Sequence, residues 1–289
     1  MLKYVILLRP RQWVKNLILF AGLIFSHHLD NLNSLLTTIA AFSLFCLLSS
    51  SVYIFNDLHD LENDRQHPNK RFRPLPAGQI KPKTAWFIFV LLALLSLTLS
   101  FLLAPTFGLI ALSYLVMFIA YTLYLKHVVI IDVLIIALGF VLRAAAGAAV
   151  LRVEISPWLL VCTILLALFL ALSKRRHELI LLEENAESHR KILEEYSAYF
   201  LDQMISVVTA STVMSYTLYT LSERTIRELK TTNLPLTIPF VLYGIFRYLY
   251  LIHLKSEGGR PEQLLFTDRP LLIDIILWGL SVSFILYLR

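Results

Sequence analysis

Charged side chains are scarce in this chain of 289 residues. They make up 16% of the sequence and hydrophobic residues 57%, whereas a typical soluble domain carries about 25% charged residues. This composition excludes a soluble globular protein and predicts an integral membrane protein. Cysteine is also rare, since only Cys46 and Cys162 occur and both lie in apolar runs. A disulfide framework is therefore excluded, and we expect both to pack as small apolar residues.

Long apolar runs fill most of the chain. About 20 apolar residues in a helix cross the roughly 30 Å of hydrocarbon in a bilayer. We therefore expect an all-α membrane protein with a single domain over residues 1–289 and nine transmembrane helices. No small-residue cleavage site follows the first run, so we expect a retained span and no removed signal peptide. The predicted spans are 12–29, 33–55, 84–104, 106–124, 130–151, 157–173, 203–222, 234–254 and 271–288.

Lysine and arginine are unevenly distributed between the loops. If the N-terminus is cytoplasmic, most of the 26 basic residues lie on the cytoplasmic side, as the positive-inside rule requires. We therefore expect a multi-pass protein of the cell membrane whose N-terminus and active site are cytoplasmic. The net charge of +6 then indicates anionic lipid headgroups or phosphorylated substrates as partners, and not nucleic acid.

An acidic stretch, NDLHDLENDRQHPNKRFRP, follows the second predicted span at residues 56–74. If the helix continues, Asp57, Asp60 and Asp64 lie on one face, where they repel each other unless a cation lies among them. Hard oxygen ligands of this kind suit magnesium. The alternative is a solvated polar helix end. Four basic side chains follow, suited either to phosphate or to anchoring at the membrane surface: His67, Lys70, Arg71 and Arg73.

The sequence NDLHDLEND at residues 56–64 matches the NDxxDxxxD motif of the UbiA superfamily of intramembrane prenyltransferases. Five further segments resemble the decaprenyl-phosphate phosphoribosyltransferase branch of that superfamily: LRPRQWVKN, HPNKRFRP, LYLKHVVIIDV, GFVLRAAAGA and LSKRRHE. The similarity extends from the first span through the sixth. It implies nine helices around a lipid-accessible cavity, with Asn56 and the three aspartates at a site for magnesium and diphosphate.

The chain departs from ordinary members of that superfamily at the end of the sixth span. A second acidic motif, DxxxD, is expected there, but residues 172–185 read LSKRRHELILLEEN, with Lys174, Arg175 and Arg176 in its place. A lipid with one phosphate needs cations, and a second carboxylate cluster would repel it. We therefore expect this basic trio to bind a lipid phosphate. Two alternatives are a cytoplasmic anchor and a displaced metal site built from Glu178, Glu183 and Glu184.

Other candidate site residues lie near the expected cytoplasmic mouth. Lys126 either contacts substrate or snorkels to the interface, and Asp132 begins the fifth span, where an ionisable group is a functional candidate. Arg143 shares a helix face with Gly139 and Gly147, which permit close packing, so it either binds substrate or is held by a carboxylate. The remaining candidates are Lys15, Asn16 and Tyr124.

The resemblance and the missing second acidic motif together predict a magnesium-dependent phosphoribosyltransferase. It would move 5-phosphoribosyl from phosphoribosyl diphosphate (PRPP) to a polyprenyl phosphate of the decaprenyl type and release diphosphate, toward the arabinose donor of the cell envelope. One alternative is a UbiA-type prenyltransferase with a prenyl diphosphate donor and an aromatic or other acceptor. Another is a lipid transporter, which predicts broken helices and charges near the bilayer midplane. A homo-oligomer is left open.

Overall fold

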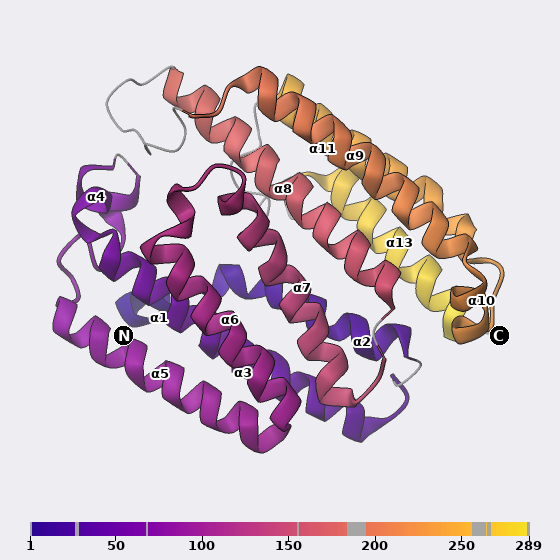
Figure 1. Ribbon diagram of the computed structural model, residues 1–289, viewed down its shortest axis with the longest axis horizontal. Helices are drawn as coiled ribbons and strands as arrows, with labels where there is room; N and C mark the ends of the chain where they lie inside the picture. The colour runs from indigo at the N-terminus through magenta and orange to yellow at the C-terminus, as the bar shows by residue number, and fades with distance from the viewer. Residues whose placement is uncertain are drawn as a thin grey trace.

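The computed structural model describes residues 2–26, 29–67, 69–154, 156–183, 195–255, 264 and 267–287. These residues form a helical bundle without a strand (Figure 1). Eight helical segments among them are long and apolar enough to cross a membrane, and they correspond to eight of the nine predicted spans. The long helices are α3 (Leu32–His59), α5 (Pro82–Leu103), α6 (Pro105–Leu123), α7 (Ile131–Leu151), α8 (Pro157–Glu183), α9 (Ala198–Leu221), α11 (Ile238–Leu254) and α13 (Arg269–Tyr287).

The first predicted span, residues 12–29, is not a single helix. The structure instead has α1 (Leu2–Leu8), the 3₁₀ helix η1 (Pro10–Leu19) and α2 (Phe20–Phe25). A separate break lies before the predicted span, at Arg9, whose φ of 53° and ψ of 58° are left-handed. Arg9 precedes Pro10, which disfavours helical geometry at the residue before it. A 3₁₀ helix joined directly to a short α-helix therefore occupies most of the first predicted span, and the described residues do not confirm a count of nine transmembrane helices.

The N-terminal segment packs closely against α7. A Cβ atom added at Gly147 would lie 2.0 Å from the carbonyl oxygen of Leu19, and one added at Gly22 would lie 3.0 Å from the backbone nitrogen of Ala148. Only residues without side chains allow backbones to approach so closely. The close packing predicted for the small residues of α7 is thus confirmed at Gly147, and it brings η1 against the middle of the bundle.

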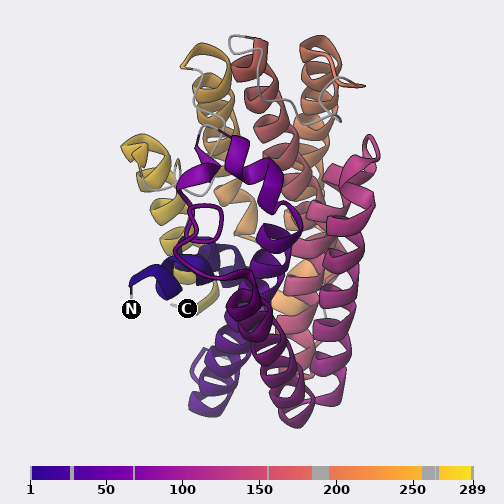
Figure 2. The same cartoon turned by 90° about the vertical axis from the view of Figure 1, so that its left-hand side faces the viewer.

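The short polar elements gather at one end of the bundle. Figures 1 and 2 both place α4 and the connection from α6 to α7 at the end where α3 and α8 terminate. The polar ends of distant chain segments therefore meet there. The short elements are α4 (Leu61–Gln66), η2 (Lys70–Phe72) and η3 (Leu125–His127), with α10 (Glu223–Leu229) and η5 (Leu234–Thr237) elsewhere in the chain.

Candidate active site

The acidic cluster, which we define as Asp57, Asp60 and Asp64, lies across a helix break. Helix α3 ends at His59, and Asp60, with φ of −91° and ψ of 10°, joins it to α4. The expected continuous helix is therefore wrong at Asp60. The turn nevertheless continues through backbone hydrogen bonds, because the amide of Asp60 donates to Asn56 at 2.9 Å and that of Asp64 donates to Asp60 at 2.8 Å. All three carboxylates thus stay close to the end of α3. We call this end of the bundle, with the acidic cluster, the acidic mouth.

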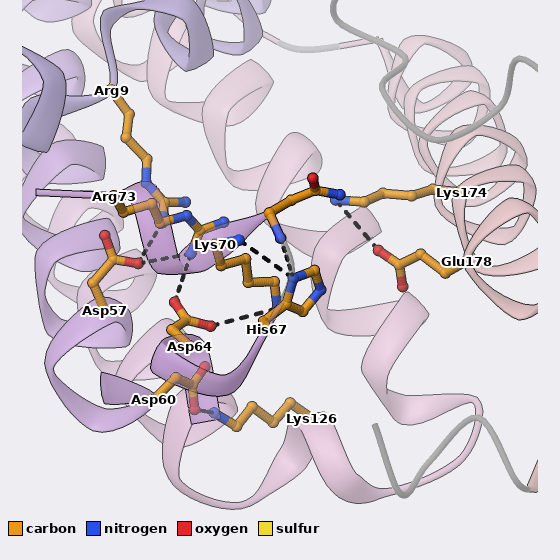
Figure 3. A network of polar contacts seen from close by, with 11 residues as sticks. Arg9, Asp57, Asp60, Asp64, His67, Lys70, Arg73, Lys126, Lys174 and Glu178 are labelled. Atoms are coloured by element: carbon orange, nitrogen blue, oxygen red, sulfur yellow. Dashed lines mark hydrogen bonds and ion pairs between the residues drawn. The ribbon is translucent and has the colours of Figure 1, made fainter. Parts of the chain in front are cut away.

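Two carboxylates of the cluster share one arginine. The Nη1 atom of Arg73 donates to Asp57 at 3.1 Å and to Asp64 at 2.8 Å (Figure 3). Arg9 also pairs with Asp57, and Lys70 lies 3.6 Å from Asp64. Both aspartates are only 2% exposed, and a buried carboxylate is costly unless it is paired. Five side chains therefore stabilise one another, and they come from the residue after α1, from α3, from α4 and from the loop after α4.

Asp60 faces a different cation. Lys126 from η3 donates to its carboxylate, and Lys126 is 3% exposed. Lys126 therefore points into the mouth, and the alternative of snorkelling to the membrane interface is wrong for this residue. The nearby Asn56 accepts a hydrogen bond from Thr122 at 3.4 Å, whereas Tyr124 is 72% exposed.

The basic loop after α4 contains a histidine whose ring accepts two backbone hydrogen bonds. Nδ1 of His67 accepts from the backbone amides of Asn69 at 3.1 Å and Lys70 at 3.3 Å. Burial, followed by the charge of Lys70, lowers the pKa of this imidazole. Burial and the neighbouring Arg9 likewise lower the pKa of Arg73. Arg71 is exposed, with its guanidinium 4.8 Å from the ring centre of Phe72.

The oxygen donors of Asp57 and Asp64 fit magnesium. Among the described residues, no three side chains of His, Cys, Asp and Glu converge into a ready-made metal site. However, Arg73 Nη1 lies between two carboxylates and marks a position that already accommodates positive charge. Magnesium is usually bound by one or two carboxylates, with water and substrate phosphate completing its shell. Two aspartates at this mouth satisfy that requirement.

The basic trio of α8 does not act as one group. Consecutive residues of an α-helix point about 100° apart. Lys174 is 3.9 Å from Glu178, and its side chain is 43% exposed; Figure 3 shows it directed toward the His67–Lys70 region. Arg175 and Arg176 point elsewhere, so the expectation that all three bind one phosphate is not supported. Glu184 lies outside the described residues, as does the side chain of Glu183.

The two arginines of the trio already pair with carboxylates. Arg175 is 3% exposed and donates from Nε to Asp132 at 2.7 Å, and its Nη1 lies 2.6 Å from Glu178. Arg176 pairs with Asp202 in the first turns of α9. The sequence contained no pattern that would identify Asp202 as a partner, because α9 joins α8 only in the folded bundle. Asp132 and Arg175, both expected to face substrate, instead face each other.

A second polar cluster lies deeper in the bundle. Arg143 is 3% exposed, donates from Nε to Asn16 at 2.7 Å and from Nη1 to the carbonyl of Gly139 at 2.9 Å, and stacks 4.7 Å from the ring centre of Tyr114. No carboxylate pairs with Arg143 among the residues that the structure describes. This cluster explains why Asn16 is fully buried, while Lys15 stays partly exposed.

Known proteins resemble this chain over nearly its whole length. The model of the UbiA prenyltransferase family matches residues 17–267. The decaprenyl-phosphate phosphoribosyltransferase of Mycolicibacterium smegmatis is 33% identical over 290 residues, 96% of this chain and 91% of that protein. The protein of the same name from Corynebacterium glutamicum is 32% identical over 97% of this chain and 86% of its own length.

The fold also matches a solved structure. A UbiA homolog from Archaeoglobus fulgidus bound to GPP and Mg2+ superposes with a TM-score of 0.73, covering 97% of this chain and 99% of that one at 20% identity. At this level of identity the likeness concerns the arrangement of helices alone.

Proposed function

Because this chain belongs to the UbiA prenyltransferase family, we propose that its acidic mouth transfers 5-phosphoribosyl from PRPP to a polyprenyl phosphate of the decaprenyl type. Diphosphate is the second product. The observation that carries this proposal is 33% identity, along 96% of the chain, to an enzyme of that name. The basic end of α8 supports it, since Lys174 faces the mouth where a phosphate acceptor would need a cation.

The charges at the mouth suit a phosphorylated donor. Three carboxylates face four cations, and each cation is held by an ion pair that a phosphate could replace: Arg9, Lys70, Arg73 and Lys126. Asp57 and Asp64 would hold magnesium, which neutralises negative charge that grows on the diphosphate. The four cations would then turn from carboxylate to phosphate oxygens. Charge-assisted hydrogen bonds of this kind are among the strongest in proteins.

The reaction itself needs no strong base. The acceptor phosphate is already anionic near neutral pH. Its oxygen forms a bond to ribose C1 while the bond from C1 to the diphosphate oxygen breaks, and the electron pair leaves with the diphosphate. Attack opposite the leaving group inverts C1 through an oxocarbenium-like state. The work of the protein is to hold the two phosphates in line, with Lys174 on the acceptor side and Arg73 and Lys126 on the donor side.

The membrane places the two substrates on opposite sides of one mouth. PRPP enters from the cytoplasm, and the lipid enters from the bilayer, in a multi-pass protein with a cytoplasmic N-terminus. The product is a lipid-linked ribose phosphate toward the arabinose donor of the cell envelope. A prenyl diphosphate donor, as in the Archaeoglobus fulgidus structure with GPP, is the competing reaction.

The deciding experiment follows a radiolabel into lipid. Purified protein is incubated with decaprenyl phosphate and PRPP labelled in the ribose, with magnesium or with EDTA. Label should enter the organic phase only with magnesium and both substrates. A parallel reaction contains labelled geranyl diphosphate and an aromatic acceptor in place of PRPP and the lipid phosphate. Transfer in that reaction alone would contradict the proposed function.

A further inference from the structure

The connection between α6 and α7 is held in an unusual backbone conformation. It carries Lys126 to Asp60 and ends at Ile130, which has φ of 70° and ψ of −43°. Positive φ is a genuine outlier for a β-branched residue, and these angles approach the rare classic γ-turn. Such strain persists only where the surroundings impose it, and it concentrates near functional sites.

A buried tyrosine imposes this conformation. The hydroxyl of Tyr196 accepts a hydrogen bond from the amide of Ile130 at 2.7 Å and donates one to Asp132 at 2.8 Å. The other oxygen of Asp132 accepts from Arg175 at 2.7 Å. The three side chains are 4%, 0% and 3% exposed, respectively. A chain of hydrogen bonds therefore runs from this backbone amide through Tyr196, which precedes α9, and Asp132, in the first turn of α7, to Arg175 in α8.

The same connection is tied to the position of Lys126. The amide of Asp132 donates to the carbonyl of Val128 at 3.1 Å, and the amide of Val128 donates to that of Leu125 at 3.2 Å. These bonds join η3 to the first turn of α7. A change in the backbone at Ile130 is therefore transmitted to Lys126 over four residues, and Lys126 is the cation that faces Asp60.

We propose that Tyr196, Asp132 and Arg175 form a clamp that holds the connection at Ile130 in its strained form and thereby aims Lys126 at the diphosphate of the donor. These three are positioning residues, because they are linked to Lys126 only through the hydrogen-bonded backbone of residues 125–132. The inference rests on the proposed function for the identity of the donor. The effect of the clamp on diphosphate binding does not depend on that identity, because both the phosphoribosyl and the prenyl reactions release diphosphate.

The test removes one hydroxyl. Tyr196→Phe should weaken binding of inorganic diphosphate, measured by calorimetry with magnesium, and should raise the KM for PRPP, each by about ten-fold, as expected for loss of buried hydrogen bonds. The KM for polyprenyl phosphate should change less than two-fold. Tyr199→Phe is the matched control, since Tyr199 is 75% exposed, and it should leave all three values unchanged.

A second substitution separates positioning from simple stability. Ile130→Gly removes the steric cost of positive φ, so Tyr196→Phe made in that background should change diphosphate binding by only two- to three-fold. Non-additivity of this size is the signature of coupled residues. An equal effect of Tyr196→Phe in both backgrounds, or a loss of thermal stability with unchanged diphosphate binding, would overturn the clamp. Normal diphosphate binding without transfer from PRPP would instead contradict the proposed function.

Discussion

The three aspartates of the acidic cluster differ in how deeply they are buried. The side chains of Asp57 and Asp64 are 3% exposed, and both pair with Arg73. Asp60 is 15% exposed, and among the described residues its carboxylate pairs with Lys126, whose side chain is only 4% exposed. Removal of one partner of a buried ion pair costs about 3–5 kcal/mol in stability. Replacement of Asp60 is therefore expected to lower stability as well as activity.

Asp60→Asn should lower kcat by about 10²-fold or more, the range typical for loss of one preorganised electrostatic group, and it should also lower the melting temperature, because the buried Lys126 loses its ionic partner. Label transfer and thermal unfolding in detergent measure the two effects. Glu62→Gln is the control, because Glu62 lies on α4 with a 78% exposed side chain. Full activity of Asp60→Asn would remove this residue from the site.

His67 makes the stability of the basic loop depend on pH. Its usual pKa is 6.5, and burial lowers that value in the folded protein. The folded protein thus binds the proton less readily than the unfolded chain, so the contribution of His67 to stability is present above pH 6.5 and is lost as the pH falls through the lowered pKa. Protonation would also remove the lone pair that accepts the amides of Asn69 and Lys70.

We therefore expect kcat/KM for PRPP to fall as the pH drops below 6.5, because the loop that carries Lys70 and Arg73 loses its anchor. A pH profile from 5 to 8 measures this fall. His67→Asn keeps an acceptor oxygen that cannot be protonated in this range, so its profile should be flatter. An identical fall in His67→Asn would assign the pH dependence to another group.

At the scale of elements, α8 distributes its basic trio over three neighbourhoods. Lys174 faces the mouth, Arg175 faces the first turn of α7, and Arg176 faces α9. One helix thereby contributes to the site, to the clamp and to the packing of the bundle. Substitutions at adjacent positions should consequently produce different defects.

Lys174→Gln should raise the KM for polyprenyl phosphate by roughly ten-fold, since a hydrogen bond to a charged group contributes about 1.5–3 kcal/mol. Arg175→Gln should instead destabilise the protein, because it leaves Asp132 buried without its ionic partner. Arg176→Gln should change neither KM. Steady-state kinetics and melting temperatures of the three variants measure these outcomes. Equal increases in the KM for polyprenyl phosphate in all three variants would instead support the interpretation that the trio binds one lipid phosphate.

Much of this arrangement could be predicted from sequence, and the remainder depended on contacts between distant segments. Apolar length predicted nine spans, of which eight correspond to long helices of the described residues, and spacing predicted that Asp57 and Asp64 lie close together. The pairing of Arg9 with Asp57 and of Tyr196 with Asp132 joins residues 48 and 64 positions apart. No local pattern encodes such pairs. The divergence of the basic trio follows from helix geometry, but only the packing of α7 and α9 shows which carboxylates each arginine meets.

At the scale of the whole molecule, the proposed site lies at one end of a bundle whose long helices expose many large hydrophobic side chains. Helix α4, the connection from α6 to α7 and the C-terminal end of α8 share that end (Figure 1). The positive-inside rule predicts that this end of the bundle faces the cytoplasm. The orientation of the bundle therefore determines which compartment supplies the donor.

Single cysteines can measure that orientation directly. Cys46 and Cys162 are first replaced by serine, and Gln66→Cys or Asn33→Cys is then added, since both positions are exposed and lie near opposite ends of α3. A membrane-impermeant maleimide applied to intact cells should label Asn33→Cys and leave Gln66→Cys unlabelled until the membrane is opened. Because PRPP is charged and does not cross a bilayer unaided, labelling of Gln66→Cys from outside would place the acidic mouth away from its donor and contradict the proposed reaction.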